Sequence, residues 1–233
     1  MSRKTMFQAG IYLAACLALL AVPLVIDDAF LLNKYARYLV FGMLAVALSL
    51  SWGYAGILNL GQAMTFGIGS YAMAMALKLK TVPIHTGSGG LPDFMVWNNV
   101  TELPWIWVPF QSLAFAILGG VAIAAGVAAL LGWFMFRGRI TGVYAAIITL
   151  ATLVVVQLLI IDRQDWTGGF NGLTDLAQLE IAGFLFDAYA TSTYYLVAIC
   201  LSASLLLAFV VAKSKTGLVL QAIRDQEGRV QYF

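Results

Sequence analysis

An uncharged, apolar segment with five glycines extends from Ser51 to Tyr71 and reads SWGYAGILNLGQAMTFGIGSY. Each glycine inside a helix costs roughly 1 kcal/mol relative to alanine. Five of them within so short a segment therefore predict a break or a bend in a helix. At membrane depth such a break is tolerated only where the backbone lines a cavity or is covered by other helices. The segment is therefore typical of a transport protein.

The same segment supplies polar groups. Transporters use interrupted helices to present free backbone N–H and C=O groups to a substrate. We therefore assign to a candidate substrate path Gly53, Gly56, Asn59, Gly61, Gln62, Thr65 and Ser70. Two other interpretations stay open. The glycines would also allow helices to approach closely, and Gly56–Gly61 would also suit a short turn between two spans.

The composition of the whole chain points to a lipid environment. The chain has 233 residues, of which 62% are hydrophobic and 10% are charged, whereas a soluble domain carries about 25% charged residues. Only helices or a closed barrel satisfy the backbone in lipid, and apolar runs near twenty residues favour helices. We predict an all-α integral membrane protein, a polytopic helical bundle with about six transmembrane helices, one of them broken by glycines.

The predicted spans follow the apolar runs. They are Phe7–Ile26, Tyr38–Leu58, Leu60–Leu77, Trp105–Phe136, Ile140–Ile161 and Thr193–Ala212. Residues 1–212 then form a transmembrane domain, and residues 213–233 form a cytoplasmic segment. The resemblance given below implies that the first is a permease domain, incomplete relative to its family, and that the second is a coupling segment. With a cytoplasmic N-terminus, the cytoplasmic segments hold eight lysines and arginines and the outer segments hold five. Because basic residues favour the cytoplasmic side, we predict that both termini are cytoplasmic.

Several chemistries are missing from the sequence. No charged residue falls in the middle of a predicted span, which argues against proton or ion coupling and favours a neutral substrate. No phosphate-binding loop of the form GxxxxGK[ST] occurs, so any ATP would be hydrolysed by a separate polypeptide. Neither a catalytic triad nor a set of metal ligands is recognisable. We therefore expect a transport subunit, not an enzyme, with no catalytic residue, no metal and no cofactor.

Four motifs resemble, in order, the membrane permeases of branched-chain amino acid type ABC importers. They are Trp52–Gln62 with Gly69–Met73, Arg139–Tyr144, Thr167–Thr174 and Ala222–Glu227. The resemblance implies an outer-loop motif that contains Gly168, Gly169, Asn171 and Gly172. It also implies a coupling helix that contacts the ATPase through Ala222, Ile223, Arg224, Asp225 and Glu227. Gln62 stands where many relatives have a different polar residue.

Two further segments, Gly90–Met95 and Thr101–Trp105, resemble the urea-transport branch of that family. The resemblance implies import of urea or a related small amide across the bacterial inner membrane. The implied partners are a second related permease, two ATPases, an external solute-binding protein and membrane lipid, but no nucleic acid. Relatives continue with further spans, so the resemblance also implies a C-terminally truncated chain. Transport of branched-chain or other amino acids and a stand-alone channel remain as alternatives.

Overall fold

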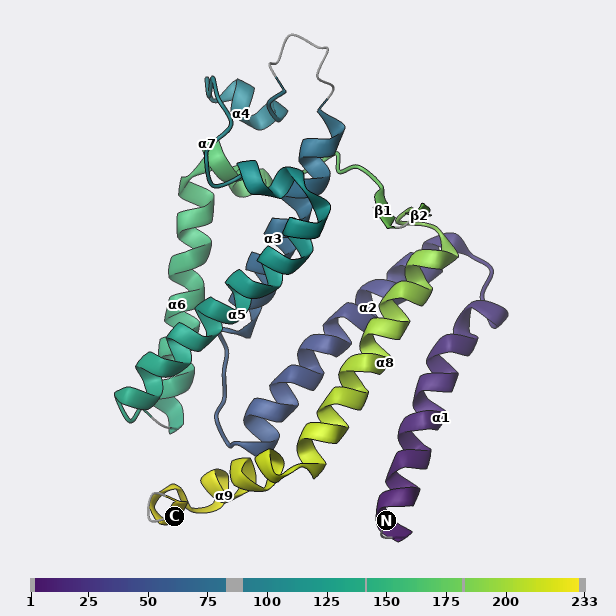
Figure 1. The fold of residues 1–233 in the computed structure, drawn as a ribbon, viewed down its shortest axis with the longest axis vertical. Helices are drawn as coiled ribbons and strands as arrows, with labels where there is room; N and C mark the ends of the chain where they lie inside the picture. Colours follow the sequence, from purple (N-terminus) through teal and green to yellow (C-terminus); the bar gives the residue numbers. More distant parts are fainter. Residues whose placement is uncertain (1–2, 83–89, 141, 182, 231–233) are drawn as a thin grey trace. The chain divides into compact units, whose positions relative to one another are not determined.

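The computed structural model describes residues 3–82, 90–140, 142–181 and 183–230, with the backbone alone for residues 3–6, 8–9 and 226–230. This part of the chain is almost entirely helical (Figure 1). It forms two compact units, one from residues 1–58 and 180–233 and the other from residues 59–179. Each unit is described separately below.

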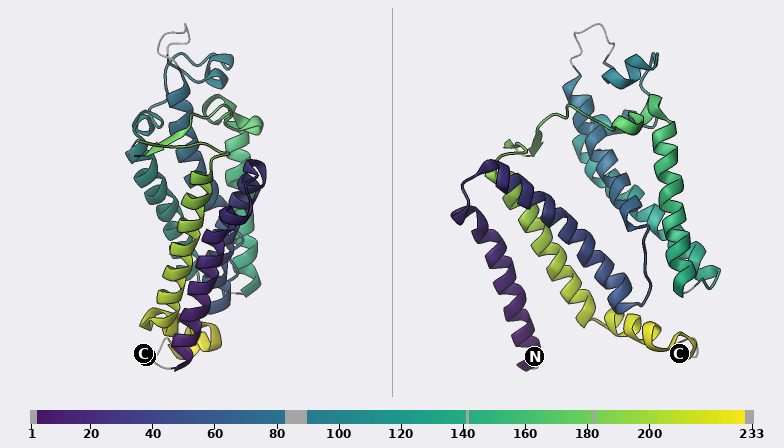
Figure 2. Two further views of the ribbon diagram at one scale, coloured as in Figure 1. Left: turned by 90° about the vertical axis from the view of Figure 1, so that its right-hand side faces the viewer. Right: turned by 180° about the vertical axis from the view of Figure 1, so that it is seen from behind.

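The first unit consists of helices that pack along their lengths. Its elements are α1 (Arg3–Val25), α2 (Ala29–Leu48), the π-helix η1 (Ser49–Tyr54), α8 (Thr191–Lys213) and α9 (Lys215–Val230). Helices α2 and α8 run side by side (Figure 2). Their shared core contains Leu32, Ala36, Tyr194 and Ala198. The Tyr194 hydroxyl donates to the carbonyl oxygen of Leu19 at 2.9 Å, which ties α1 to α8.

The second unit is built around α3 (Gln62–Thr81), α5 (Leu113–Arg137) and α6 (Gly142–Asp162). Its shorter helices are α4 (Asp93–Trp97), η2 (Val108–Gln111), α7 (Gln164–Thr167) and η3 (Gly169–Asn171). Helices α3 and α5 approach closely, since a Cβ atom at Gly120 would lie 2.9 Å from the Cβ of Ala72. Small residues at such a contact are typical of helix packing in membranes.

Strands make only a small contribution to the described part of the chain. The strands β1 (Leu179–Ile181) and β2 (Phe184–Phe186) pair into a two-stranded sheet. The rest of the regular structure is helical.

Four described helical segments are long and apolar enough to cross a membrane, namely Ala29–Tyr54, Leu113–Arg137, Gly142–Asp162 and Thr191–Lys213. Helix α1 adds the shorter apolar helix Gly10–Val25. The prediction of an all-α polytopic membrane protein is confirmed. Helix α3 covers the third predicted run, but it is less apolar because its last turn contains Lys78 and Lys80.

The second predicted span, Tyr38–Leu58, begins later in the sequence than the helix that the structure shows there. Helix α2 starts at Ala29 and not at Tyr38, because the carboxylate of Asp28 caps its N-terminus. The Asp28 Oδ1 atom accepts a hydrogen bond of 2.8 Å from the backbone N–H of Phe30. Such a cap satisfies one of the free N–H groups in the first turn of a helix.

The glycine break lies between two helical elements. Residues 55–61 connect η1 to α3 without regular helix, and Gly56 has a φ of +72° that favours glycine. Gly67 and Gly69 lie inside α3, which continues through both of them. This geometry agrees with the interpretation of Gly56–Gly61 as a short turn, since these residues lie between the end of η1 and the start of α3.

Candidate functional site

Residues 59–61 are held against α6 in the second unit. The Asn59 Oδ1 atom accepts a hydrogen bond of 3.0 Å from the backbone N–H of Gly61. The N–H of Leu60 donates to the Thr149 hydroxyl of α6 at 3.1 Å. A Cβ atom at Gly61 would lie 2.9 Å from the carbonyl oxygen of Thr149. Gly61 therefore permits a close approach that a larger residue would prevent.

Thr149 is the polar group on which this contact depends. It is 1% exposed, and its hydroxyl donates within α6 to the carbonyl oxygen of Ala145 at 2.9 Å or of Ala146 at 3.0 Å. The same oxygen accepts from Leu60, so that the donor and acceptor capacity of the hydroxyl is used. Thr149 is not among the residues predicted from the sequence, where its only signal is a hydroxyl inside an otherwise apolar run.

The seven predicted path residues are divided between the two units. Gly53 and Gly56 belong to the first unit, and the other five belong to the second. Within α3 the Thr65 hydroxyl donates to the carbonyl oxygen of Gln62 at 2.9 Å. The exposed Ser70 hydroxyl donates to its own helix in the same way. Their role in a substrate path stays a prediction.

A cavity of about 350 Å³ lies in the second unit, between α3, α6 and the loop that contains η3. We call it the transport cavity, after the role that is proposed for it below. Its walls are mostly apolar side chains such as Ile68 and Val156, and its polar side chains are Tyr71 and Gln157. No charged side chain lines it among the described residues. None of the seven predicted path residues lines it, although Gly67 and Tyr71 of the same glycine-rich segment do.

The outer-loop motif contributes backbone to the transport cavity. Gly169 and Gly172 line the cavity, and they have positive φ angles of 58° and 69°. The Tyr71 hydroxyl donates to the carbonyl oxygen of Thr167 at 3.1 Å, and the Trp107 indole donates to the carbonyl oxygen of Trp166 at 2.9 Å. These two bonds fix the loop to the remainder of the second unit. Asn171 is exposed at the end of η3.

The tail of the chain meets the other end of the glycine-rich segment, within the first unit. A terminal nitrogen (Nη1) of Arg224 in α9 donates to the carbonyl oxygen of Gly53 in η1 at 2.7 Å. A Cβ atom at Gly56 would lie 2.8 Å from Cγ of the same arginine. Arg224 also pairs with Asp225 at 3.0 Å. The structure therefore joins one predicted path motif to the predicted coupling segment.

The structure shows no comparable contact for the other predicted coupling residues whose side chains it describes. Ala222 is exposed and Ile223 is half-buried, while the side chain of Glu227 lies outside the described part of the chain. The turn that directs α9 depends on Gly217, where a Cβ atom would collide with the backbone oxygen of Ala212. A glycine at this position therefore sets the direction in which the tail leaves α8.

An ion pair between a buried lysine and a more exposed aspartate holds the α4 segment to α3. Lys78 is only 5% exposed and lies 2.9 Å from the carboxylate of Asp93. Burial raises the pKa of the Asp93 carboxyl, but the hydrogen bonds from Lys78 and Phe94 and the charge of Lys78 outweigh it, so the pKa lies below its usual value. The third predicted span ends at Leu77 and leaves Lys78 in the following loop, whereas Lys78 belongs to the last turn of α3. Within the described residues, no group of His, Cys, Asp and Glu is close enough to hold a metal ion.

Comparison with known proteins gives one match. A family model described as the permease component of a branched-chain amino acid transport system matches residues 30–233. The match includes the four candidate spans from α2 to α8, the outer-loop motif and the tail. No curated protein and no solved structure matches the chain. The chain belongs to the family of permease components of branched-chain amino acid transport systems.

Proposed function

We propose that the chain is the membrane permease subunit of an ATP-driven importer that moves urea or a related small amide across the bacterial inner membrane. The observation that carries the proposal is the transport cavity, which combines apolar walls, one amide side chain and backbone from glycines. Its volume of about 350 Å³ falls at the lower end of the range for small-molecule sites, about 300–1,000 Å³.

The polar groups of the cavity suit an amide. The Gln157 side chain offers both a carbonyl acceptor and an N–H₂ donor, which complement the donor and acceptor of urea. A zwitterionic amino acid would bring two charges into a poorly hydrated space, and buried charges require partners of opposite charge. The described lining supplies none. This favours a neutral cargo over a charged one.

A second candidate function is transport of branched-chain amino acids. The description of the matching family favours it directly. The apolar walls of the transport cavity, including Ile68, Val156 and Ile160, would also accommodate an aliphatic side chain. The two candidates differ in the charge of the cargo and therefore in their dependence on Gln157.

We infer that the working importer contains a second related permease, two ATPases and an external solute-binding protein. Both termini would be cytoplasmic, and residues 213–233 would contact the ATPase through Ala222, Ile223, Arg224, Asp225 and Glu227. Movement of this segment would be transmitted to η1 through Arg224 and then to the glycine-rich segment. The contact between Arg224 and Gly53 supports this route.

The experiment that tests the cargo is substitution of Gln157 in the assembled importer. Gln157→Leu removes the amide, and we expect uptake of labelled urea to fall about tenfold, since a net hydrogen bond contributes about 0.5–1.5 kcal/mol. Gln111→Leu is the matched control, because Gln111 is exposed in η2 and does not line the cavity. Urea uptake equal to the unmodified level in Gln157→Leu, or uptake of leucine alone, would contradict the amide proposal.

A further inference from the structure

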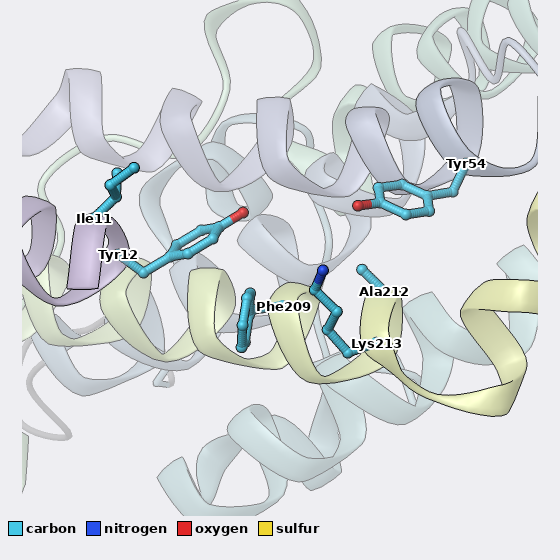
Figure 3. Close-up of a pocket in the computed structure, with 6 residues that line it drawn as sticks. All are labelled: Ile11, Tyr12, Tyr54, Phe209, Ala212 and Lys213. Carbon is cyan, nitrogen blue, oxygen red and sulfur yellow. The ribbon is translucent and has the colours of Figure 1, made fainter. Parts of the chain in front are cut away.

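A second cavity, of about 260 Å³, lies in the first unit between α1, η1 and the end of α8 (Figure 3). It is lined by Ile11, Tyr12, Tyr54, Phe209, Ala212 and Lys213. In Figure 3 the hydroxyls of the two tyrosines and the ammonium of the lysine point toward the same space. These three polar groups come from three different elements, so the site exists only in the folded unit.

The three polar groups together favour an anion. The lysine ammonium carries three hydrogen-bond donors and no acceptor, and each phenol adds one donor. In the described part of the chain the ion pairs are Lys78–Asp93 and Arg224–Asp225, so that no carboxylate there neutralises Lys213. The ammonium lies 5.9 Å from the centre of the Phe209 ring, and that ring lies 5.0 Å from the ring of Tyr12. The aromatic contacts hold the charge beside the cavity.

The position of the cavity favours an amphiphilic anion. Lys213 is the last residue of the candidate span Thr191–Lys213, which places its charge where a span ends and lipid headgroups begin. Apolar side chains beside the cavity remain open to the surroundings: Ile11 is 55% exposed, and Leu206 and Val210 of α8 are also exposed. A small inorganic anion would use the ammonium but not this apolar surface.

We propose that this cavity binds the headgroup of an anionic phospholipid. The phosphate oxygens accept hydrogen bonds from Lys213, Tyr12 and Tyr54, and an acyl chain lies along the exposed apolar side chains of α1 and α8. Basic pockets between transmembrane helices are suited to such headgroups. The lipid bridges α1, η1 and α8, and α8 leads directly into α9. The proposal requires only that the chain spans a membrane and does not depend on the cargo.

The test is retention of lipid by the purified full chain with its partner subunits, measured by native mass spectrometry after exchange into defined lipid mixtures. We expect phosphatidylglycerol to be retained in preference to phosphatidylcholine. Lys213→Gln should weaken retention about fivefold, which corresponds to the roughly 1 kcal/mol that a basic residue contributes near anionic lipid. Lys215→Gln is the matched control, because Lys215 is exposed on α9 and does not line the cavity.

Two further variants keep the test decisive. The pair Tyr12→Phe and Tyr54→Phe retains the charge and the ring volumes, and it should weaken retention about fivefold to hundredfold through the loss of two hydrogen bonds. Lys213→Arg keeps the positive charge and should retain lipid as the unmodified chain does. That result would show that Lys213→Gln acts through the loss of charge and not through misfolding. Equal losses in the Lys213→Gln and Lys215→Gln variants would indicate general surface charge and overturn the proposal. Equal retention of both lipids, or displacement of the lipid by inorganic phosphate, would also overturn it.

Discussion

Replacement of Gly168 by alanine is expected to disrupt the loop that lines one side of the transport cavity. Gly168 has a φ of +78°, and its Cβ atom would lie 2.5 Å from the carbonyl oxygen of Gly172. The oxygen is a backbone atom and cannot turn aside as a flexible side chain would. The backbone of the loop itself must therefore move. The left-handed conformation costs roughly 1–2 kcal/mol in a residue with a Cβ, and the collision adds to it. We expect a total loss of roughly 3 kcal/mol in unfolding free energy and more than tenfold slower uptake.

Gly172→Ala is the matched control for this prediction. Gly172 also has a positive φ, of 69°, but a Cβ atom there would meet nothing within 4 Å. This variant therefore carries backbone strain without the collision. Its φ of 69° and ψ of −161° lie in a region that essentially only glycine adopts, and a residue with a Cβ atom there loses about 1–3 kcal/mol. Thermal unfolding of the reconstituted protein and uptake by the assembled importer measure both variants. Unchanged thermal unfolding and uptake in Gly168→Ala would show that backbone collision does not govern the loop.

Replacement of Arg224 by glutamine is expected to uncouple ATP hydrolysis from uptake. The substitution removes the hydrogen bond to the Gly53 carbonyl oxygen, which joins α9 to η1. Hydrogen bonds to charged groups contribute about 1.5–3 kcal/mol, and the partial exposure of Arg224 reduces that value. We expect ATP hydrolysis to continue while uptake per ATP falls about tenfold. The two rates are measured in the same proteoliposomes.

Gly56→Ala should reproduce this uncoupling from the opposite side of the contact. The Cβ atom of the new alanine would lie 2.8 Å from Cγ of Arg224, and the alanine would have to adopt the positive φ of Gly56, +72°. Because both substitutions act on one contact, their combined effect should be smaller than the sum of the separate effects. Lys215→Gln removes a positive charge from the same helix without touching Gly53 and serves as the control. Full coupling in Arg224→Gln, or strict additivity with Gly56→Ala, would contradict the proposed route.

The sequence was sufficient for the helical membrane fold because long apolar runs have one main solution in lipid. It was less informative at helix ends. The cap at Asp28 extends α2 across Lys34 and Arg37, two charges that favoured a loop in the sequence. Lys78 also favoured a loop in the sequence. A lysine is favourable in the last turn of a helix, but its burial against Asp93 is not predicted by any local pattern.

The candidate site was harder to predict. The glycine-rich segment contributes Gly67 and Tyr71 to the cavity lining, but the direction in which each side chain points depends on how α3 packs against α6. For this reason the sequence favoured Asn59 and Ser70, whereas the cavity is lined by Tyr71 and Gln157. The contact between Arg224 and Gly53 joins residues 171 positions apart. Such contacts follow from tertiary packing and leave no local signal.

The most direct test of the central claim is uptake of labelled urea by proteoliposomes that contain this chain with its partner permease, ATPases and binding protein. The account predicts that urea accumulates inside only when ATP is supplied, and that unlabelled leucine does not compete. Accumulation of leucine but not urea would contradict the proposed cargo. Equilibration of urea at the same rate without ATP would contradict the importer and indicate a channel.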